Sequence, residues 1–299
     1  MTHSTHTDHH LEGLALLAVG LLALLVFSVP AVGEQSASRK SVTGSGSKDA
    51  GVAVQSSSTA AKASFASGSG FNFLAVKVSN HGNLISFESP AGREGYAVCS
   101  QGGGTVHAHD TGDVEAGFGA PTFAQPNGAG TFPLTVTRRT TDGKFQLAQV
   151  WNKPDTVEKD VTVAMTLKNV SGARIDSNLL LSRSGDFDIG DSSADLGAET
   201  SDSAWMWDDV GGPEVQPAGL KLTSLTFGTN HAARMETTSD WMLGRTSPTL
   251  PPSRLGCQNL FTQTPTPEAR DLAMRSFYVF EGGLAAGQSK TVKFEYGRM

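Results

Sequence analysis

The run from Val161 to Lys168 alternates between apolar and polar or small side chains. Its apolar members are Val161, Val163, Met165 and Leu167. Successive side chains of a β-strand point to opposite faces, so this pattern is typical of a strand with one buried face and one face in water. A sheet made of such strands must cover its apolar face with a second sheet. The pattern therefore predicts an all-β chain folded as an antiparallel β-sandwich.

Other segments repeat this signal around turn-forming residues. The turns at 80–83 and 140–143 are rich in Asn, Thr, Asp and Gly, and each separates two apolar-alternating runs. Further strands are expected at 71–78, 84–88, 132–136, 145–151, 175–181, 220–227, 276–281 and 291–296. One short helix is expected at 266–275, where Thr266 could cap the helix and Pro267 could take its first position.

Two segments carry a resemblance to a known class of domain. The run Asp160 to Gly172 resembles a strand and turn of immunoglobulin-like modules in bacterial surface proteins, and Leu284 to Val292 resembles their closing strand. The resemblance is limited to about 158–183 and 284–296. It implies an immunoglobulin-like or larger two-sheet sandwich that serves as an adhesive, spacer or binding unit, and it implies no catalytic residue.

The N-terminal part carries a segment without charge. Residues 13–33 contain no charged side chain and end in small residues around Pro30. This is typical of a signal for export to the periplasm, the cell surface or the medium. No Lys or Arg precedes the segment, and an apolar run of about 20 residues can also span a bilayer, so residues 13–33 could instead remain as a membrane anchor.

Composition divides the rest of the chain. Residues 34–70 hold 25 Ser, Gly, Ala or Thr among 37 residues, which predicts a disordered linker after the export segment at 1–33. Residues 71–299 are then expected to form the β-sandwich, either as one domain or as two that divide near residue 155. The net charge of −6 and the lack of a basic run argue against a nucleic-acid partner, and the membrane is expected to be contacted only through the N-terminal segment.

The chain has two cysteines, Cys99 and Cys257, both in the expected folded part. In an oxidising compartment a single disulfide between them is the natural interpretation. Two separate buried thiols are the alternative, because the sequence does not give the distance between the two Cα atoms.

An acidic segment is the strongest candidate for a metal site. Eight acidic residues and no Lys or Arg lie between Asp186 and Asp209. Calcium prefers several oxygen ligands from a flexible loop. The candidate calcium ligands are Asp186, Asp188, Asp191 and Asp195. An ordinary solvated loop, in which aspartates serve as turn formers, is the alternative.

Two tryptophans follow this acidic segment. Trp205 and Trp207 would share one face of an extended strand, and aromatic side chains beside carboxylates are a common surface for stacking sugars. They could equally seal the edge of the core, because Trp is usually buried. His107 and His109 have the same spacing and suggest a weaker zinc site, completed by His81, His231 or an Asp.

Few short motifs stand out. Residues 169–171 form an Asn-Val-Ser glycosylation sequon. The chain has no Gly-x-Ser-x-Gly elbow, no His-Glu-x-x-His, no Cys-x-x-Cys and no phosphate-binding loop. These absences do not exclude an enzyme, because triads are recognised by geometry rather than by order in the sequence.

The sequence thus predicts an exported, non-catalytic β-sandwich protein with a binding or structural role at the cell surface or in the periplasm, where a surface polymer or protein would be its partner. The alternative is an extracellular carbohydrate-active enzyme or lectin that uses the acidic and tryptophan-containing segment 186–209.

Overall fold

The chain folds as an antiparallel β-sandwich, as the alternating pattern predicts. The computed structural model describes residues 60–69, 72–87, 89–90, 93–101, 105–112, 115–187, 195–208, 219–237 and 272–299. Within these ranges we find no helix of the length and hydropathy needed to cross a bilayer. The expected export segment, and with it the signal or anchor at 13–33, lies outside the described residues.

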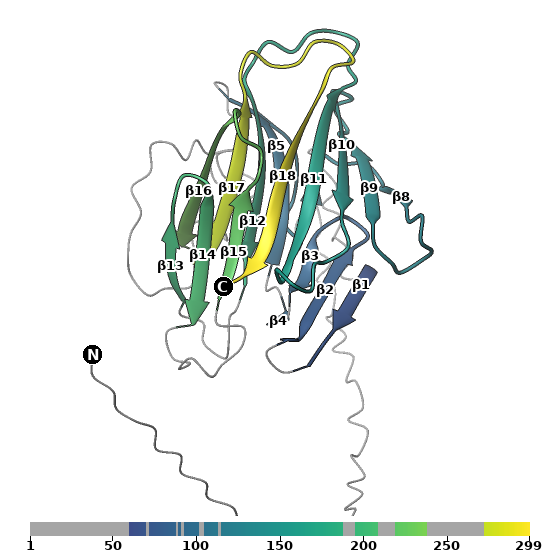
Figure 1. The fold of residues 1–299 in the computed structure, drawn as a ribbon. Coiled ribbons are helices and arrows are strands. Elements are labelled where there is room, and N and C mark those ends of the chain that lie inside the picture. The colour runs from purple at the N-terminus through teal and green to yellow at the C-terminus, as the bar shows by residue number, and fades with distance from the viewer. Residues whose placement is uncertain are drawn as a thin grey trace, which may run out of the picture. The chain divides into compact units, whose positions relative to one another are not determined.

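In the described part of the chain, eighteen strands form three sheets (Figure 1). The four-stranded sheet has the order β1-β2-β3-β4, the eight-stranded sheet β13-β14-β15-β18-β11-β10-β9-β8, and the six-stranded sheet β16-β17-β12-β5-β6-β7. Every pairing between named strands is antiparallel. The strands are β1 (Ala61–Ser67), β2 (Leu74–Ser79), β3 (Leu84–Phe87), β4 (Ser89–Pro90), β5 (Arg93–Ser100), β6 (Thr105–Asp110), β7 (Glu115–Ala116), β8 (Thr122–Ala124), β9 (Leu134–Arg139), β10 (Phe145–Trp151), β11 (Asp160–Asn169), β12 (Leu179–Asp186), β13 (Asp195–Glu199), β14 (Ser203–Asp208), β15 (Leu220–Ser224), β16 (Asn230–Thr237), β17 (Leu272–Phe280) and β18 (Ser289–Arg298).

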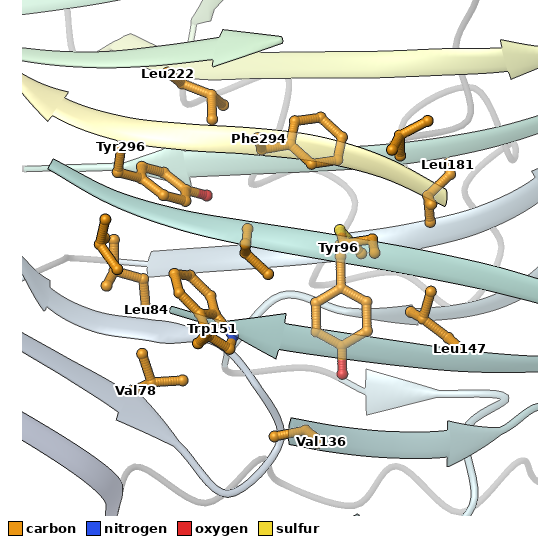
Figure 2. Packing of buried hydrophobic residues seen from close by; sticks show 14 of the residues in the cluster. Val78, Leu84, Tyr96, Val136, Leu147, Trp151, Leu181, Leu222, Phe294 and Tyr296 are labelled. Atoms are coloured by element: carbon orange, nitrogen blue, oxygen red, sulfur yellow. The ribbon is translucent and has the colours of Figure 1, made fainter. Parts of the chain in front are cut away.

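One large apolar cluster fills the space between the sheets. It contains side chains from all three of them, including Val78 and Leu84 of the four-stranded sheet, Tyr96 of the six-stranded sheet, and Trp151 and Phe294 of the eight-stranded sheet. Figure 2 shows these side chains packed between the strands. Members of this cluster come from both sides of residue 155, so the described segments before and after that position share it.

The strand predicted from the alternation at 161–168 is confirmed as β11. β11 alternates buried and half-buried side chains along its length, and Val161, Val163 and Met165 are completely buried. β11 pairs with β10 on one side and with β18 on the other. β18 is therefore an interior strand, and it joins the β13–β15 part of the sheet to the β8–β11 part.

The expected linker at 34–70 ends earlier than composition indicates. β1 lies inside that range and pairs with β2 over most of its length. Ala63 is buried and Phe65 packs against the core. Small residues suit a disordered chain, but pairing with β2 satisfies the backbone groups of β1, and two apolar contacts are enough to hold it. Residues 34–59 lie outside the described part of the chain.

The expected helix at 266–275 is wrong where it can be compared with the structure. Leu272 already begins β17, which pairs with β12 on one side and with β16 on the other. A strand inserted between two partners gains a full ladder of hydrogen bonds on each edge, and this tertiary pairing outweighs the local helical preference of residues 272–275.

Asn169 serves the fold rather than a glycan. Its side chain is fully buried. Its Nδ2 donates to the carbonyl oxygens of Ala173 at 2.7 Å and Leu284 at 2.9 Å, and its Oδ1 accepts from the amide and the hydroxyl of Ser171. The amide nitrogen that a glycan would need is thus engaged inside the folded protein.

Asn169→Ala should destabilise the protein by about 2–4 kcal/mol, because it removes the two hydrogen bonds that a fully buried side chain donates to Ala173 and Leu284, together with the acceptor for Ser171. Urea unfolding curves with an unchanged slope would measure the loss. Asn152→Ala is the matched control, since the exposed Asn152 bonds only the Thr162 hydroxyl among the contacts of its side chain and should cost less than about 0.5 kcal/mol. Equal midpoints for the two variants would contradict this role of Asn169.

Candidate functional site

Trp205 and Trp207 lie on the same face of β14, as their spacing predicts. Ala204 and Met206 alternate with them and are fully buried in the core, whereas the two tryptophans are half-buried on the opposite, outward face of the eight-stranded sheet. β14 is held between β13 and β15, so its outward face is presented on a paired strand. The tryptophans are therefore part of the surface of the sandwich rather than of its interior.

The strand register places charged residues in line with Trp205. Lys221 of β15 lies directly opposite Trp205, Gly297 of β18 lies opposite Lys221, and Asp160 of β11 lies opposite Gly297. Gly297 has no side chain, so the row of side chains is interrupted between Lys221 and Asp160. A Cβ atom at Gly297 would lie 3.8 Å from Asp160 Cβ and 3.8 Å from Glu295 Oε1. Both carboxyl groups thus border the same piece of bare backbone.

We call Trp205, Trp207, Lys221, Asp160, Glu295 and Gly297 the tryptophan–carboxylate face. Its carboxyl groups hold protons more tightly than usual. Partial burial, followed by the charges of Glu295, Asp155 and Glu158, raises the pKa of Asp160 to about 6. Burial also raises the pKa of Glu295, although Lys221 opposes that shift. Near neutral pH the face therefore offers both a hydrogen-bond acceptor and, in a fraction of molecules, a protonated donor.

The structure adds Asp160 and Glu295, which the sequence does not suggest, to the acids considered near the tryptophans. Asp186 is buried at the end of β12, in the six-stranded sheet, and does not lie in a solvated loop. Asp188 and Asp191 lie outside the described residues. Asp195 begins β13 opposite Asp208. Calcium binding by these residues stays a prediction. Asp160 and Glu295 were missed because only strand pairing brings β11, β15 and β18 alongside β14.

A second cluster of charges lies inside the sandwich. The guanidinium of Arg183 and the carboxylate of Glu94 are completely buried and 2.6 Å apart. Glu94 also accepts hydrogen bonds from the Tyr296 hydroxyl at 2.5 Å and the Leu84 amide at 2.7 Å. Arg183 donates to Gln149 Oε1 at 2.7 Å and stacks over the ring of Trp151 with its central carbon 4.6 Å from the ring centroid. Burial raises the pKa of Glu94, and the charge of Arg183 opposes that shift.

His81, Asp110 and Glu115 form the one group in the described part of the chain whose ligand atoms lie close enough for a metal ion, within 4.8 Å of one another. The chemistry of these residues does not fit a metal centre. Arg138 donates to both carboxylates, at 2.9 Å to Asp110 and by a short contact to Glu115. Hydrogen bonds to Asp110 and Glu115 raise the pKa of His81 to about 9, so two positive groups already balance two negative ones. A metal ion would have to displace the proton of His81 and compete with Arg138 for both carboxylates.

The expected zinc pair of His107 and His109 does not assemble. Both ring nitrogens of His107 are engaged, Nδ1 with Asp142 and Nε2 with Ser100. A register shift opposite Val98 and Cys99 leaves His107 as the extra residue of β6, between Val106 and Ala108. His107 packs against Phe145 of the main core, whereas His109 lies opposite Ala97 of a smaller apolar cluster on the other face of the sheet. His231 is held separately by Thr229 and Asp202.

Only one cysteine of the predicted disulfide lies among the described residues. Cys99 is buried on β5, and Cys257 lies outside the described residues. The bond between them stays a prediction.

No protein-family model and no curated protein matches this sequence. Similar solved structures are a bacterial glucoamylase complexed with acarbose (8% identity, TM-score 0.43, 76% of this chain and 30% of that one), a heparan sulfate lyase mutant from Pedobacter heparinus (10%, 0.38, 78% and 34%) and a putative aldose 1-epimerase from Escherichia coli K12 (12%, 0.33, 78% and 98%). The chain spans about a third of the length of the first two. Similarity at this level does not bear on what this chain does. The resemblance to immunoglobulin-like surface modules stays a prediction.

Arg183→Met should destabilise the protein by about 3–5 kcal/mol, because it leaves the carboxylate of Glu94 buried without its counter-charge. The double variant Glu94→Gln with Arg183→Met should recover part of the loss, since no unpaired charge then remains. Chemical denaturation of the wild type, both single variants and the double variant gives the coupling energy. A double variant no more stable than Arg183→Met would contradict the role of the charge.

Stability should fall as the pH rises through 9. The folded-state pKa of His81, at about 9, lies above the ordinary value of 6.5, so the folded protein binds the proton more tightly than the unfolded chain. The stabilisation is complete below pH 6.5 and is lost as the pH rises through 9, with a slope of at most about 1.4 kcal/mol per pH unit. The groups that face His81 are Asp110, Glu115 and Arg138.

Denaturation midpoints at half-unit pH steps, for the wild type and for His81→Asn, measure this slope. The variant should be nearly flat between pH 6.5 and 9 because its side chain does not titrate. Parallel curves for the two proteins would show that the pH dependence originates elsewhere.

Proposed function

We propose that this chain is a carbohydrate-binding β-sandwich protein and that the tryptophan–carboxylate face is its binding site. The observation that supports the proposal is the placement of Trp205 and Trp207 on the outward face of β14, where Trp205 is in register with Lys221 and Gly297, and two carboxyl groups border Gly297. Sugar rings present a C–H face that stacks on an indole and a rim of hydroxyl groups that bond carboxylates.

The paired strands that carry the tryptophan–carboxylate face also support this function. All the side chains of the face stand on paired strands, and strands hold binding groups in fixed positions more accurately than loops do. The half-buried state of both tryptophans leaves part of each ring available while the rest is anchored on the sheet. Little ordering would then be needed when a ligand binds.

The charge of the face indicates which sugars it would take. Asp160, Glu295, Asp155 and Glu158 lie near one another, and Lys221 is the counter-charge next to Glu295. An acidic polysaccharide would be repelled by these carboxyl groups. Neutral polysaccharides are therefore the proposed ligands. The apolar segment at 13–33 supports export of the chain, which would bring the site into contact with polymers outside the cell or in its envelope.

Trp205→Ala and Trp207→Ala should each weaken binding of a neutral polysaccharide by about tenfold or more, because each removes one stacking surface. Affinity electrophoresis in gels that contain soluble β-glucan or xylan would measure the retardation, with an alginate gel as the anionic comparison. Phe227→Ala is the matched control, since Phe227 is 78% exposed and lies outside the face. Unretarded wild-type protein in both neutral gels, or equal retardation of all variants, would refute the proposal.

Hydrolysis of the bound polymer is the second candidate function, and the raised pKa of Asp160 is the observation that favours it. Acid and base carboxyl groups in glycosidases lie about 5–9.5 Å apart. Release of reducing ends from the same polysaccharides, lost in Asp160→Asn while retardation persists, would identify an enzyme. Retardation without release of reducing ends would identify a binding protein.

A further inference from the structure

Three side chains at one end of the sandwich are joined by hydrogen bonds in the order hydroxyl, imidazole, carboxylate. Ser100 Oγ lies 2.8 Å from His107 Nε2, and His107 Nδ1 lies 2.7 Å from Asp142 Oδ2. Ser100 ends β5, His107 belongs to β6, and Asp142 lies in the turn between β9 and β10. None of these residues belongs to the tryptophan–carboxylate face.

The carboxylate is fixed and ionised. Asp142 Oδ1 accepts from the Thr140 hydroxyl at 2.6 Å and from the Lys144 amide at 3.0 Å. Partial burial opposes ionisation, but the hydrogen bonds from Thr140, Lys144 and His107 hold the pKa of Asp142 below its usual range. An ionised carboxylate can only accept a hydrogen bond, so the proton of a neutral imidazole must be on Nδ1. The lone pair of Nε2 then points to the hydroxyl of Ser100.

The imidazole is also held in place by packing. His107 is 6% exposed, and its ring meets Phe145 edge-on with the ring centroids 4.8 Å apart. At the other end, the Ser177 hydroxyl donates to Ser100 Oγ at 3.0 Å, which leaves the proton of Ser100 for His107. Ser100 itself is half-buried, so its oxygen is not sealed within the core.

A purely structural role would need only that His107 be satisfied by two partners. The arrangement goes further, because it supplies a hydroxyl, a base in the correct tautomer and an anion that orients the base, which are the three parts of an activated serine. We propose that Ser100 is a nucleophile for acyl transfer from esters, with His107 as its general base and Asp142 as the positioning residue.

The reaction balances without any further group. Ser100 Oγ attacks the carbonyl carbon of an ester and its proton passes to His107 Nε2. The bond between carbon and the alkoxy oxygen then breaks, and the departing alcohol takes the electron pair and the proton from Nε2. Water attacks the resulting acyl-serine in the same way. The carboxylic acid leaves, and Ser100 regains its proton.

A fluorophosphonate probe tests the nucleophile directly on the full-length protein, because attack by Ser100 on phosphorus expels fluoride and leaves a stable adduct. Mass spectrometry of proteolytic peptides should find the adduct on Ser100. Ser100→Ala should abolish the adduct, and His107→Gln should slow its formation about a hundredfold or more. Ser289→Ala, which removes an exposed hydroxyl on β18, should label as the wild type does.

Asp142 is tested by conservative replacement. Asp142→Asn should slow labelling about a hundredfold or more, because an amide can donate to Nδ1 and so stabilises the wrong tautomer. Asp142→Glu keeps the charge and should restore part of the rate. Circular dichroism of each variant establishes that it is folded. No adduct on Ser100 in folded wild-type protein, or labelling that is equally fast in His107→Gln, would overturn the proposal. Trp205→Ala should label normally, so this result and the carbohydrate result stand independently.

Discussion

The ion pair of Glu94 and Arg183 is the interaction on which the three sheets depend. Both residues belong to the six-stranded sheet, yet their hydrogen bonds reach Gln149 and Tyr296 in the eight-stranded sheet and the Leu84 amide in the four-stranded sheet. Charges removed from water are costly unless every polar atom finds a partner, and apolar residues of similar volume often stabilise a core as well. The pair contributes directional hydrogen bonds between the sheets. Its hydrogen bonds depend on distance and angle and have partners in all three sheets, whereas apolar contacts have no such directional requirement.

Much of the fold follows from the period of two in the sequence. The hairpin of β9 and β10 and the burial pattern of β11 are where the alternation places them. The helix expected at 266–275 and the linker expected to reach residue 70 fail for one reason, which is that pairing with neighbours decides the state of a short segment. β17 gains partners on both edges, and β1 gains β2. Neither gain can be read from the segment itself.

The residues of the candidate sites also fall into those that one segment's sequence reveals and those that only strand pairing brings together. The shared face of Trp205 and Trp207 is a property of one strand, so their spacing reveals it. Asp160 and Glu295 join them only through the pairing of β11, β18 and β15. His107 was interpreted as one of a metal-binding pair because its spacing from His109 is that of a strand. The register shift in β6 gives the two rings different surroundings, and a bulge of this kind leaves no clear signal in the sequence.

The position of β18 has a consequence for how the chain acquires its structure. β18 follows the other described strands along the sequence, and in the eight-stranded sheet it stands between the β13–β15 and β8–β11 blocks. During synthesis on the ribosome each block keeps an open edge, at β15 or β11, until β18 emerges. Contacts between such distant parts of a chain form slowly, and open edges invite pairing with other molecules. The eight-stranded sheet of the nascent chain thus remains incomplete until β18 has been synthesised.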